Sequence, residues 1–255
     1  MKPKIIVTRD IPDEVESMLK EYFLVSFNRE DKVFSKDILI KAMENADGIL
    51  CTVTDNITDE LLSLTNKKVK IIANIGVGVD HIDLQSAKKN NVIITNTPDV
   101  LTEATVDIAT LLLLSVTRNA FLVEKMLRQG KWRGFSLTEN LGVDVRGKIL
   151  GIVGMGRIGK AFAKRAHEAF GMKVLYYNRS PVKGLTFEAS VRFDLDALLE
   201  ESDVISLHLS SDEGNKNFIS KSRMKKIRNS SFLINTSRGD VIDQTALIDL
   251  LEKKK

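Results

Sequence analysis

The chain has 255 residues, of which 43% are hydrophobic and 28% charged, and it holds no apolar run near the roughly 20 residues that span a bilayer. We therefore expect a globular protein with one large or two moderate cores and exclude an integral membrane protein. The 38 basic and 34 acidic residues, with a net charge of +4, are interspersed, which favours a solvated surface over a nucleic-acid-binding one. The only cysteine, Cys51, excludes an internal disulfide and leaves no partner for a thiolate metal site. With no apolar leader at the N-terminus, this composition predicts a cytoplasmic protein without a bound metal.

Short β-branched segments alternate with longer amphipathic ones from the first residues onward, which is typical of parallel α/β sheets. In the N-terminal part, strands are expected at 5–8, 24–27, 48–52, 71–74 and 92–95, and helices at 13–22, 36–43, 59–64 and 84–89. This pattern predicts a first domain, residues 1–99, with a doubly wound, flavodoxin-like parallel sheet.

A second series of elements begins after Pro98. A long apolar helix is expected at 103–118, then a polar, aromatic-bearing segment around Gly130 to Asn140. Strands are expected at 149–153, 173–177, 204–207 and 232–235, and helices at 157–170 and 244–252. Residues 100–255 are therefore predicted to form a second doubly wound sheet, a Rossmann domain. Only four or five of the six or so strands common in that fold can be placed, so we expect this domain to be incomplete at its C-terminus.

Three glycines, Gly154, Gly156 and Gly159, directly follow a predicted strand and open the next helix. In dinucleotide-binding folds, the first permits a tight turn, the second lets the backbone approach a pyrophosphate, and the third lets the helix pack closely on the strand. Amides at the start of the helix, those of Arg157 and Ile158 among them, face the anion in such sites. We predict a nucleotide-binding loop here, the alternative being a glycine turn that only packs.

The end of the following strand reads Asn178, Arg179 and Ser180, where NAD sites usually place an acidic residue for the ribose hydroxyls. A guanidinium and a hydroxyl in place of a carboxylate would attract the 2′-phosphate of NADP. The pattern favours NADP over NAD as the cofactor, and the alternative is a solvated surface arginine.

Thr236, Ser237 and Arg238 follow the last predicted strand, at the carboxyl edge where ligands bind in open α/β sheets. A guanidinium offers paired donors and a permanent charge, which suits Arg238 to grip a carboxylate or to polarise a keto oxygen. It could equally be a loop arginine neutralised by Asp240 or Asp243.

In the N-terminal domain, residues 74–83 read NIGVGVDHID and also follow a predicted strand. Consecutive amides beside glycines can form a nest for an anion, and Val77 and Gly78 are the expected donors to a substrate carboxylate. In the alternative interpretation, Gly76 and Gly78 only shape the turn into the following helix.

Together and in this order, NIGVGVDHID, NTPDVLTEAT, GIVGMGRIG and NTSRGDVID resemble the D-isomer-specific 2-hydroxyacid dehydrogenase family over nearly the whole chain. NTPDVLTEAT is most similar to the glyoxylate and hydroxypyruvate reductase branch, and YYNRSP to its NADP-using members. The resemblance implies an N-terminal substrate domain, a coenzyme domain, and catalysis in the cleft between them. It also implies that Arg238 is the substrate-binding catalytic arginine and that Val77 and Gly78 form the carboxylate loop. Coenzyme contacts are implied for Gly156 to Gly159, Asn178 to Ser180 and Thr236 to Arg238.

The resemblance further implies NAD(P)H-dependent reduction of a small 2-keto acid, glyoxylate or hydroxypyruvate, to the D-2-hydroxyacid. The alternatives are a D-lactate or D-3-phosphoglycerate dehydrogenase, and a non-catalytic dinucleotide-sensing protein similar to the C-terminal binding protein corepressors. Because members of the family are usually dimers through the coenzyme domain, a homodimer is expected. The apolar helix from Ala104 to Val116 and the segment around Trp132 fit such an interface, although Trp132 could equally anchor the core of one subunit.

In the family, a glutamate and the histidine that it orients as proton donor lie downstream of the last helix predicted here. We do not expect His81, His167 or His208 to replace that acid, because each can be explained as a packing or surface residue. The natural protein is therefore expected to continue past Lys255, and the 255-residue chain alone to bind coenzyme weakly and turn over little.

Overall fold

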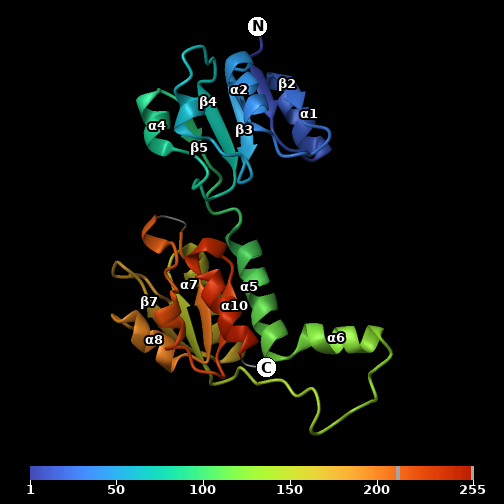
Figure 1. Ribbon diagram of the computed structural model, residues 1–255, viewed down its shortest axis with the longest axis vertical. Helices are drawn as coiled ribbons and strands as arrows, with labels where there is room; N and C mark the ends of the chain where they lie inside the picture. The colour runs from blue at the N-terminus through green and yellow to red at the C-terminus, as the bar shows by residue number, and fades with distance from the viewer. Residues whose placement is uncertain (211–212, 254–255) are drawn as a thin grey trace. The chain divides into compact units, whose positions relative to one another are not determined.

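The computed structural model describes residues 1–210 and 213–253 and consists of two compact units, Met1–Leu101 and Thr102–Lys255 (Figure 1). Their boundary lies within a few residues of the expected end of the first domain at residue 99. Each unit is a parallel sheet covered by helices and has buried hydrophobic clusters of its own. This arrangement confirms the predicted α/β class with two doubly wound sheets.

The first unit contains a five-stranded parallel sheet in the order β2-β1-β3-β4-β5. Its elements are β1 Lys4–Val7, α1 Asp13–Tyr22, β2 Leu24–Phe27, α2 Lys36–Asn45, β3 Gly48–Thr52, α3 Asp59–Leu62, β4 Ile71–Ile75, α4 Leu84–Lys89 and β5 Ile93–Thr95. The strand order reverses between β1 and β3. The carboxyl ends of these two strands therefore flank the switch point where open α/β sheets usually bind their ligands.

Local sequence explains where the helices of this unit begin. Ser35 caps α2 and Asp83 caps α4, each side chain accepting a hydrogen bond from a first-turn amide. One turn apart on α2, Leu39 and Met43 are buried in the same cluster as Ile72 of β4. The apolar stripe of the helix is thereby removed from water against the sheet.

The second unit contains a five-stranded parallel sheet in the order β10-β9-β6-β7-β8. Its elements are α5 Thr102–Thr117, α6 Ala120–Arg128, β6 Ile149–Val153, α7 Arg157–Phe170, β7 Lys173–Tyr177, β8 Ala189–Val191, α8 Leu195–Glu201, β9 Val204–Leu207, the short 3₁₀ helix η1 Glu213–Asn215, α9 Lys221–Met224, β10 Phe232–Asn235, the 3₁₀ helix η2 Gly239–Val241 and α10 Gln244–Glu252. The order reverses beside β6, so the carboxyl ends of β6 and β9 flank the switch point of this sheet.

Three helices and one strand of the second unit lie outside the predicted elements, namely α6, α8, α9 and β8. β8 has only three residues and pairs with β7 alone, and its side chains are half-buried or exposed. Such a short edge strand carries no buried apolar run that the sequence could reveal. The helices α8 and α9 are also short, so neither presents a full amphipathic period.

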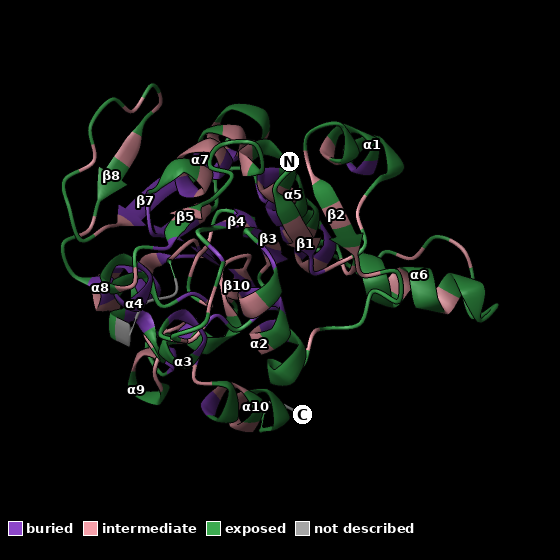
Figure 2. Ribbon diagram, turned by 90° about the horizontal axis from the view of Figure 1, so that it is seen from above, coloured by how far each residue is buried: buried purple, intermediate pink, exposed green. Residues whose placement is uncertain are grey.

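Helix α6 differs from every other long helix because none of its residues is buried, as its green and pink ribbon in Figure 2 shows. Phe121, Leu122 and Leu127 on α6 are exposed, and so is Trp132 just beyond it. That exposure favours a surface role for Trp132 over the alternative of a core anchor. No single helix in the described part of the chain is long and apolar enough to cross a membrane, and α5 and α6 reach that length and composition only together, across a 70° bend.

Candidate functional site

The three glycines after β6 adopt the positions expected of a dinucleotide-binding loop. Gly154 has a φ of 97°, and a Cβ there would lie 2.6 Å from the carbonyl oxygen of His208. A Cβ on Gly159 would lie 2.2 Å from the carbonyl oxygen of Gly154, so this glycine lets α7 pack on the strand. Gly156, by contrast, has open space over its Cα and caps α7. Two glycines are thus required by packing, and one leaves room for a ligand.

Asn178, immediately after β7, holds this glycine loop in place. Its Oδ1 accepts a hydrogen bond from the amide of Met155 at 3.0 Å, and its Nδ2 donates to the carbonyl of Ser180 at 2.8 Å. Asn178 therefore links the glycine loop to the segment that carries Arg179 and Ser180, both of which are exposed. The sequence motif predicts coenzyme contacts for all three residues, and the side chain of Asn178 has this internal role in addition.

A compact turn after β10 presents the predicted catalytic arginine. The Oδ1 of Asn235 accepts hydrogen bonds from the amide and the hydroxyl of Ser237 at 2.9 and 2.7 Å, and its Nδ2 donates to the carbonyl of Arg238 at 2.7 Å. Arg238 is half-buried, and its Nη1 donates to the carbonyl of Ser237 at 3.2 Å. Asn235 thus fixes the backbone from which the guanidinium projects.

His208, at the carboxyl end of β9, joins the glycine loop to the arginine turn. Its Nε2 lies 2.9 Å from the Oγ of Ser206, and its Nδ1 lies 3.3 Å from the Oγ1 of Thr236. Its backbone carbonyl packs against Gly154. Burial lowers the pKa of His208 from 6.5 to about 4, so the ring is neutral at physiological pH. A neutral ring that bridges two hydroxyls suits a structural role.

In the first unit, the loop after β4 carries Gly76, Val77 and Gly78. Gly76 is buried with a φ of 153°, whereas Val77 is exposed and Gly78 half-buried. No described residue accepts a hydrogen bond from the amides of Val77 and Gly78. The two predicted carboxylate donors are therefore available to a ligand.

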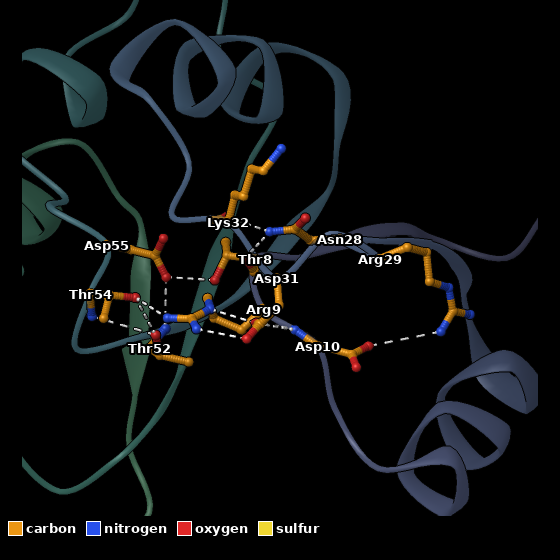
Figure 3. A network of polar contacts seen from close by, with 10 residues as sticks. All are labelled: Thr8, Arg9, Asp10, Asn28, Arg29, Asp31, Lys32, Thr52, Thr54 and Asp55. Carbon is orange, nitrogen blue, oxygen red and sulfur yellow. Dashed lines mark hydrogen bonds and ion pairs between the residues drawn. The ribbon is translucent and has the colours of Figure 1, made fainter.

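A polar network that the sequence analysis missed occupies the switch point of the first unit (Figure 3). The buried carboxylate of Asp55 accepts hydrogen bonds from the hydroxyl of Thr8 at 2.5 Å and from the amide of Thr52 at 2.9 Å. Beside it, Arg9 pairs with Asp31 at 2.7 Å and donates to the Oγ1 of Thr54 at 3.2 Å. Their positions at the carboxyl ends of β1 and β3 and in the loop after β2 are the sequence signal that could have identified them. The network fixes the loop after β3.

The residues of the second unit fit a dinucleotide. The open space over Gly156 permits the close backbone approach that a diphosphate needs, and the first-turn amides of a 14-residue helix favour an anion at the same end. Of the residues that the structure describes, no group of three His, Cys, Asp or Glu side chains is arranged to hold a metal ion.

Comparison with known proteins identifies relatives over the whole chain. The family described as "D-isomer specific 2-hydroxyacid dehydrogenase, NAD binding domain" matches residues 110–255. The glyoxylate reductase of Thermococcus litoralis is 39% identical over 258 residues, which cover 99% of this chain and 77% of the relative.

Solved structures agree with this match. A putative D-isomer-specific 2-hydroxyacid dehydrogenase from Polaromonas sp. JS6 66 has a TM-score of 0.91 at 35% identity, covering 100% of this chain and 80% of the other. An acyclic imino acid reductase, solved with NADPH and D-arginine, has a TM-score of 0.87 at 26% identity over 98% of this chain and 79% of the other. The motifs, the fold and these relatives agree, and the chain belongs to the D-isomer-specific 2-hydroxyacid dehydrogenase family of NAD(P)-dependent oxidoreductases.

Proposed function

We propose that this chain reduces a small 2-keto acid, glyoxylate or hydroxypyruvate, to the D-2-hydroxyacid with NADPH. The observation that carries the proposal is the link through His208, which joins the glycine loop at Gly154 to the turn that presents Arg238. A coenzyme loop after β6 and a guanidinium after β10 are thus held at the same edge of one sheet, on either side of β9, which carries His208. The glyoxylate reductase of Thermococcus litoralis supports this choice of substrate.

The residues divide the work by chemistry. A bound nicotinamide coenzyme supplies the hydride. The guanidinium of Arg238 binds the substrate carboxylate or the keto oxygen. At the keto oxygen it stabilises the negative charge that develops there as the carbonyl is reduced. The amides of Val77 and Gly78 bind the substrate carboxylate, because consecutive backbone donors beside glycines form an anion nest. The neutral His208 holds the turn of Arg238 in a fixed position relative to the glycine loop.

Substitution of Arg238 tests the proposal. Arg238→Lys keeps the charge but loses the planar fork, and Arg238→Ala loses both. We expect kcat/KM for glyoxylate to fall about a hundredfold to a thousandfold in Arg238→Ala, since a transition-state donor is removed. Binding of NADPH, followed by its fluorescence, should weaken far less, by up to about tenfold or about 1.4 kcal/mol, because the family resemblance implies a coenzyme contact for Arg238 as well. Binding and turnover are measured on the same preparation of each variant.

The matched control is Arg146→Ala, which removes an exposed arginine from the same unit without touching the turn. Equal turnover in Arg238→Ala and Arg146→Ala would refute the assignment of Arg238. A panel of glyoxylate, hydroxypyruvate, pyruvate and 3-phosphohydroxypyruvate, assayed with the wild type, separates the proposed substrate from those of the D-lactate and D-3-phosphoglycerate enzymes.

The preference for NADPH rests on Arg179 and Ser180, which are exposed where an acidic residue would select NAD. The NADPH in the related imino acid reductase supports the choice. Arg179→Ala should weaken NADPH about tenfold, as expected for the loss of a charge-assisted contact to phosphate, and leave NADH unchanged. NADH thus serves as the internal control in a fluorescence titration. A wild-type chain that binds NADH more tightly than NADPH would contradict the preference.

The proposal includes a homodimer formed through the second unit. Helix α6 and the segment after it expose large apolar side chains, and exposed apolar side chains that gather on one segment mark an interaction surface. Among them are Phe121, Leu122, Trp132 and Phe135. Phe135→Asp should shift the protein from dimer to monomer in light scattering. Phe193→Asp is the matched control, since Phe193 is 92% exposed and Phe135 89%, and it should leave the dimer intact. A wild-type monomer at all concentrations would refute the dimer.

A further inference from the structure

The loop after β4 is held by a buried asparagine whose side chain is fully engaged. Asn74 is 2% exposed, and its Nδ2 donates to the carbonyls of Gly76 at 3.1 Å and Gly78 at 2.9 Å. Its Oδ1 lies 3.1 Å from the Nε2 of His81. Because Nδ2 points at two carbonyls, Oδ1 is the acceptor and His81 donates through Nε2.

A second asparagine binds the carbonyl that lies between these two. The Nδ2 of Asn96, just after β5, donates to the carbonyl of Val77 at 2.9 Å. Its neighbour Thr97 binds Gly76 on both sides, since its amide donates to the Gly76 carbonyl and its Oγ1 accepts from the Gly76 amide, each at 3.1 Å. Three successive carbonyls, those of residues 76 to 78, are therefore fixed by groups of this unit.

Fixing these carbonyls also fixes the amides that follow them. In a trans peptide the C=O of one residue and the N–H of the next are coplanar and point in opposite directions. Carbonyls that face Asn74 and Asn96 therefore turn the amides of Val77, Gly78 and Val79 away from those side chains. None of these three amides donates to any residue in the described part of the chain. The loop thus offers three consecutive amide donors to a ligand, and such donors bind an anion as a nest where they converge on it.

We infer that Asn74 and Asn96 are positioning residues for the substrate carboxylate, and that the nest which they aim includes the amide of Val79 as well as those of Val77 and Gly78. This inference rests on the proposed function of the loop and deepens it. Neither asparagine contacts the substrate; each acts through a peptide plane whose rotation would replace an N–H donor by a C=O in the nest. An aspartate at position 74 keeps the size of the side chain and loses both donors, so it releases the Gly78 carbonyl and leaves the Gly76 carbonyl to the amide of Thr97.

The experiment follows the backbone amide resonances of Val77, Gly78 and Val79 by NMR while oxamate, a planar 2-keto acid analogue, is added to the NADPH-saturated chain. In the wild type, all three amides should shift with one common Kd. Asn74→Asp should raise that Kd at least about tenfold, because an unpaired buried carbonyl or a rotated peptide removes donors. Asn96→Ala, at an exposed position, should raise it about threefold to fivefold through the single Val77 carbonyl.

Two controls separate positioning from a loss of folding. Asn45→Asp makes the same chemical change at an exposed site on α2 and should leave the Kd of oxamate unchanged. His81→Gln retains an N–H donor for Asn74 and should preserve binding better than His81→Leu. Thermal melting of each variant identifies any that has unfolded, and Asn96→Ala tests the inference independently if Asn74→Asp does not fold.

The outcomes distinguish the two proposals. If wild-type amides at 77 to 79 do not respond to oxamate, the proposed carboxylate loop is wrong. If they respond, and folded Asn74→Asp and Asn96→Ala bind oxamate as the wild type does, the positioning role is wrong and the proposed function stands. A wild-type response confined to Val77 and Gly78 would remove Val79 from the nest and overturn that part of the inference.

Discussion

The two candidate anion loops of this chain, residues 76–79 in the first unit and Gly154 to Gly159 in the second, present backbone amides by different means. In the second unit the geometry comes mainly from the backbone, because two glycines permit close packing and a 14-residue helix directs its first amides outward, while the side chain of Asn178 holds the amide of Met155. In the first unit the following helix, α4, has only six residues, and the amides are aimed by the side chains of Asn74 and Asn96. The glycine loop of the second unit therefore depends mainly on residues within the loop itself. The loop at 76–79 depends on side chains that contact it in the fold.

The largest effect should come from Gly159→Ala, which tests whether close backbone packing shapes the glycine loop of the second unit. The new Cβ would lie 2.2 Å from the carbonyl oxygen of Gly154, and backbone cannot move aside as a side chain can. We expect a loss of about 3 kcal/mol in the free energy of unfolding, at the upper end of overpacking effects, together with loss of NADPH binding. Urea unfolding and coenzyme fluorescence measure the two quantities.

Gly156→Ala is the matched control for that substitution, since its Cβ would enter open space and its φ of −76° suits any residue. This variant should keep its stability within about 0.5 kcal/mol, as surface substitutions do, and still lose coenzyme affinity. Equal stability of Gly159→Ala and Gly156→Ala would show that close packing of α7 does not shape the loop.

The contrast between the loops explains how much of the site the sequence could predict. Gly154, Gly156 and Gly159 form a local pattern whose spacing follows from backbone sterics, and the strand and helix around them were predicted to within a residue. Asn74 and Asn96 are far apart in sequence, and neither residue type signals a buried hydrogen-bonding role by itself. Their function exists only once β4 and β5 lie side by side.

In the second unit, His208 is a side chain that holds a loop in place, and its protonation should have the next largest effect on stability. Burial lowers its folded-state pKa from 6.5 to about 4. The neutral ring therefore contributes stability that is complete above pH 6.5 and is lost as the pH falls from 6.5 towards 4, because the unfolded chain takes up the proton first. The loss should reach about 3 kcal/mol at most.

The measurement is the free energy of unfolding of wild type and His208→Gln across this pH range. Glutamine keeps polar contacts to Ser206 and Thr236 but cannot take up a proton, so the gap between the two curves should narrow as the pH falls. A gap that stays constant from pH 7 to pH 4 would show that the ring does not titrate as its burial requires.

Gly76→Ala makes the equivalent backbone change in the first unit and should have a smaller effect than Gly159→Ala. Its Cβ would meet only ordinary contacts, 3.5 Å from the Nδ2 of Asn74 and 3.6 Å from a methyl of Val53. The cost is the φ of 153°, which side chains rarely adopt, and we expect about 1 to 2 kcal/mol in urea unfolding. A loss as large as that of Gly159→Ala would mean that the first loop is as tightly packed as the second.

The predicted strands also marked the switch point of the first unit, but not what fills it. Arg9, Asp31 and Asp55 come from three separate loops, and each alone reads as an ordinary polar loop residue. Only the parallel order β2-β1-β3 brings these loops together at one edge of the sheet. Sequence periodicity gives the strands, whereas the order of the strands decides which polar side chains become partners.

The smallest effect is expected from Asp31→Asn, which tests whether side chains at the surface hold a loop as the buried Asn74 does. The hydrogen bond from Arg9, and then that from the amide of Asp10, lower the pKa of Asp31 from 3.8 to about 2 (Figure 3). The carboxylate therefore contributes stability that is complete above pH 3.8 and is lost as the pH falls towards 2. Both partners reach solvent, so the contribution is small and screened by salt.

Unfolding of wild type and Asp31→Asn should accordingly differ slightly at pH 7 and low salt, and the difference should shrink at high salt and on acidification towards pH 2. Glu30→Gln, which breaks the neighbouring exposed pair with Lys32, is the matched control and should change the free energy of unfolding at pH 7 by no more than about 0.5 kcal/mol. If Asp31→Asn lowered the free energy of unfolding as much as Asn74→Asp, and salt did not change the effect, the pair of Arg9 and Asp31 would behave as a buried ion pair. Loops held by buried side chains and loops held by exposed side chains would then not differ in this unit.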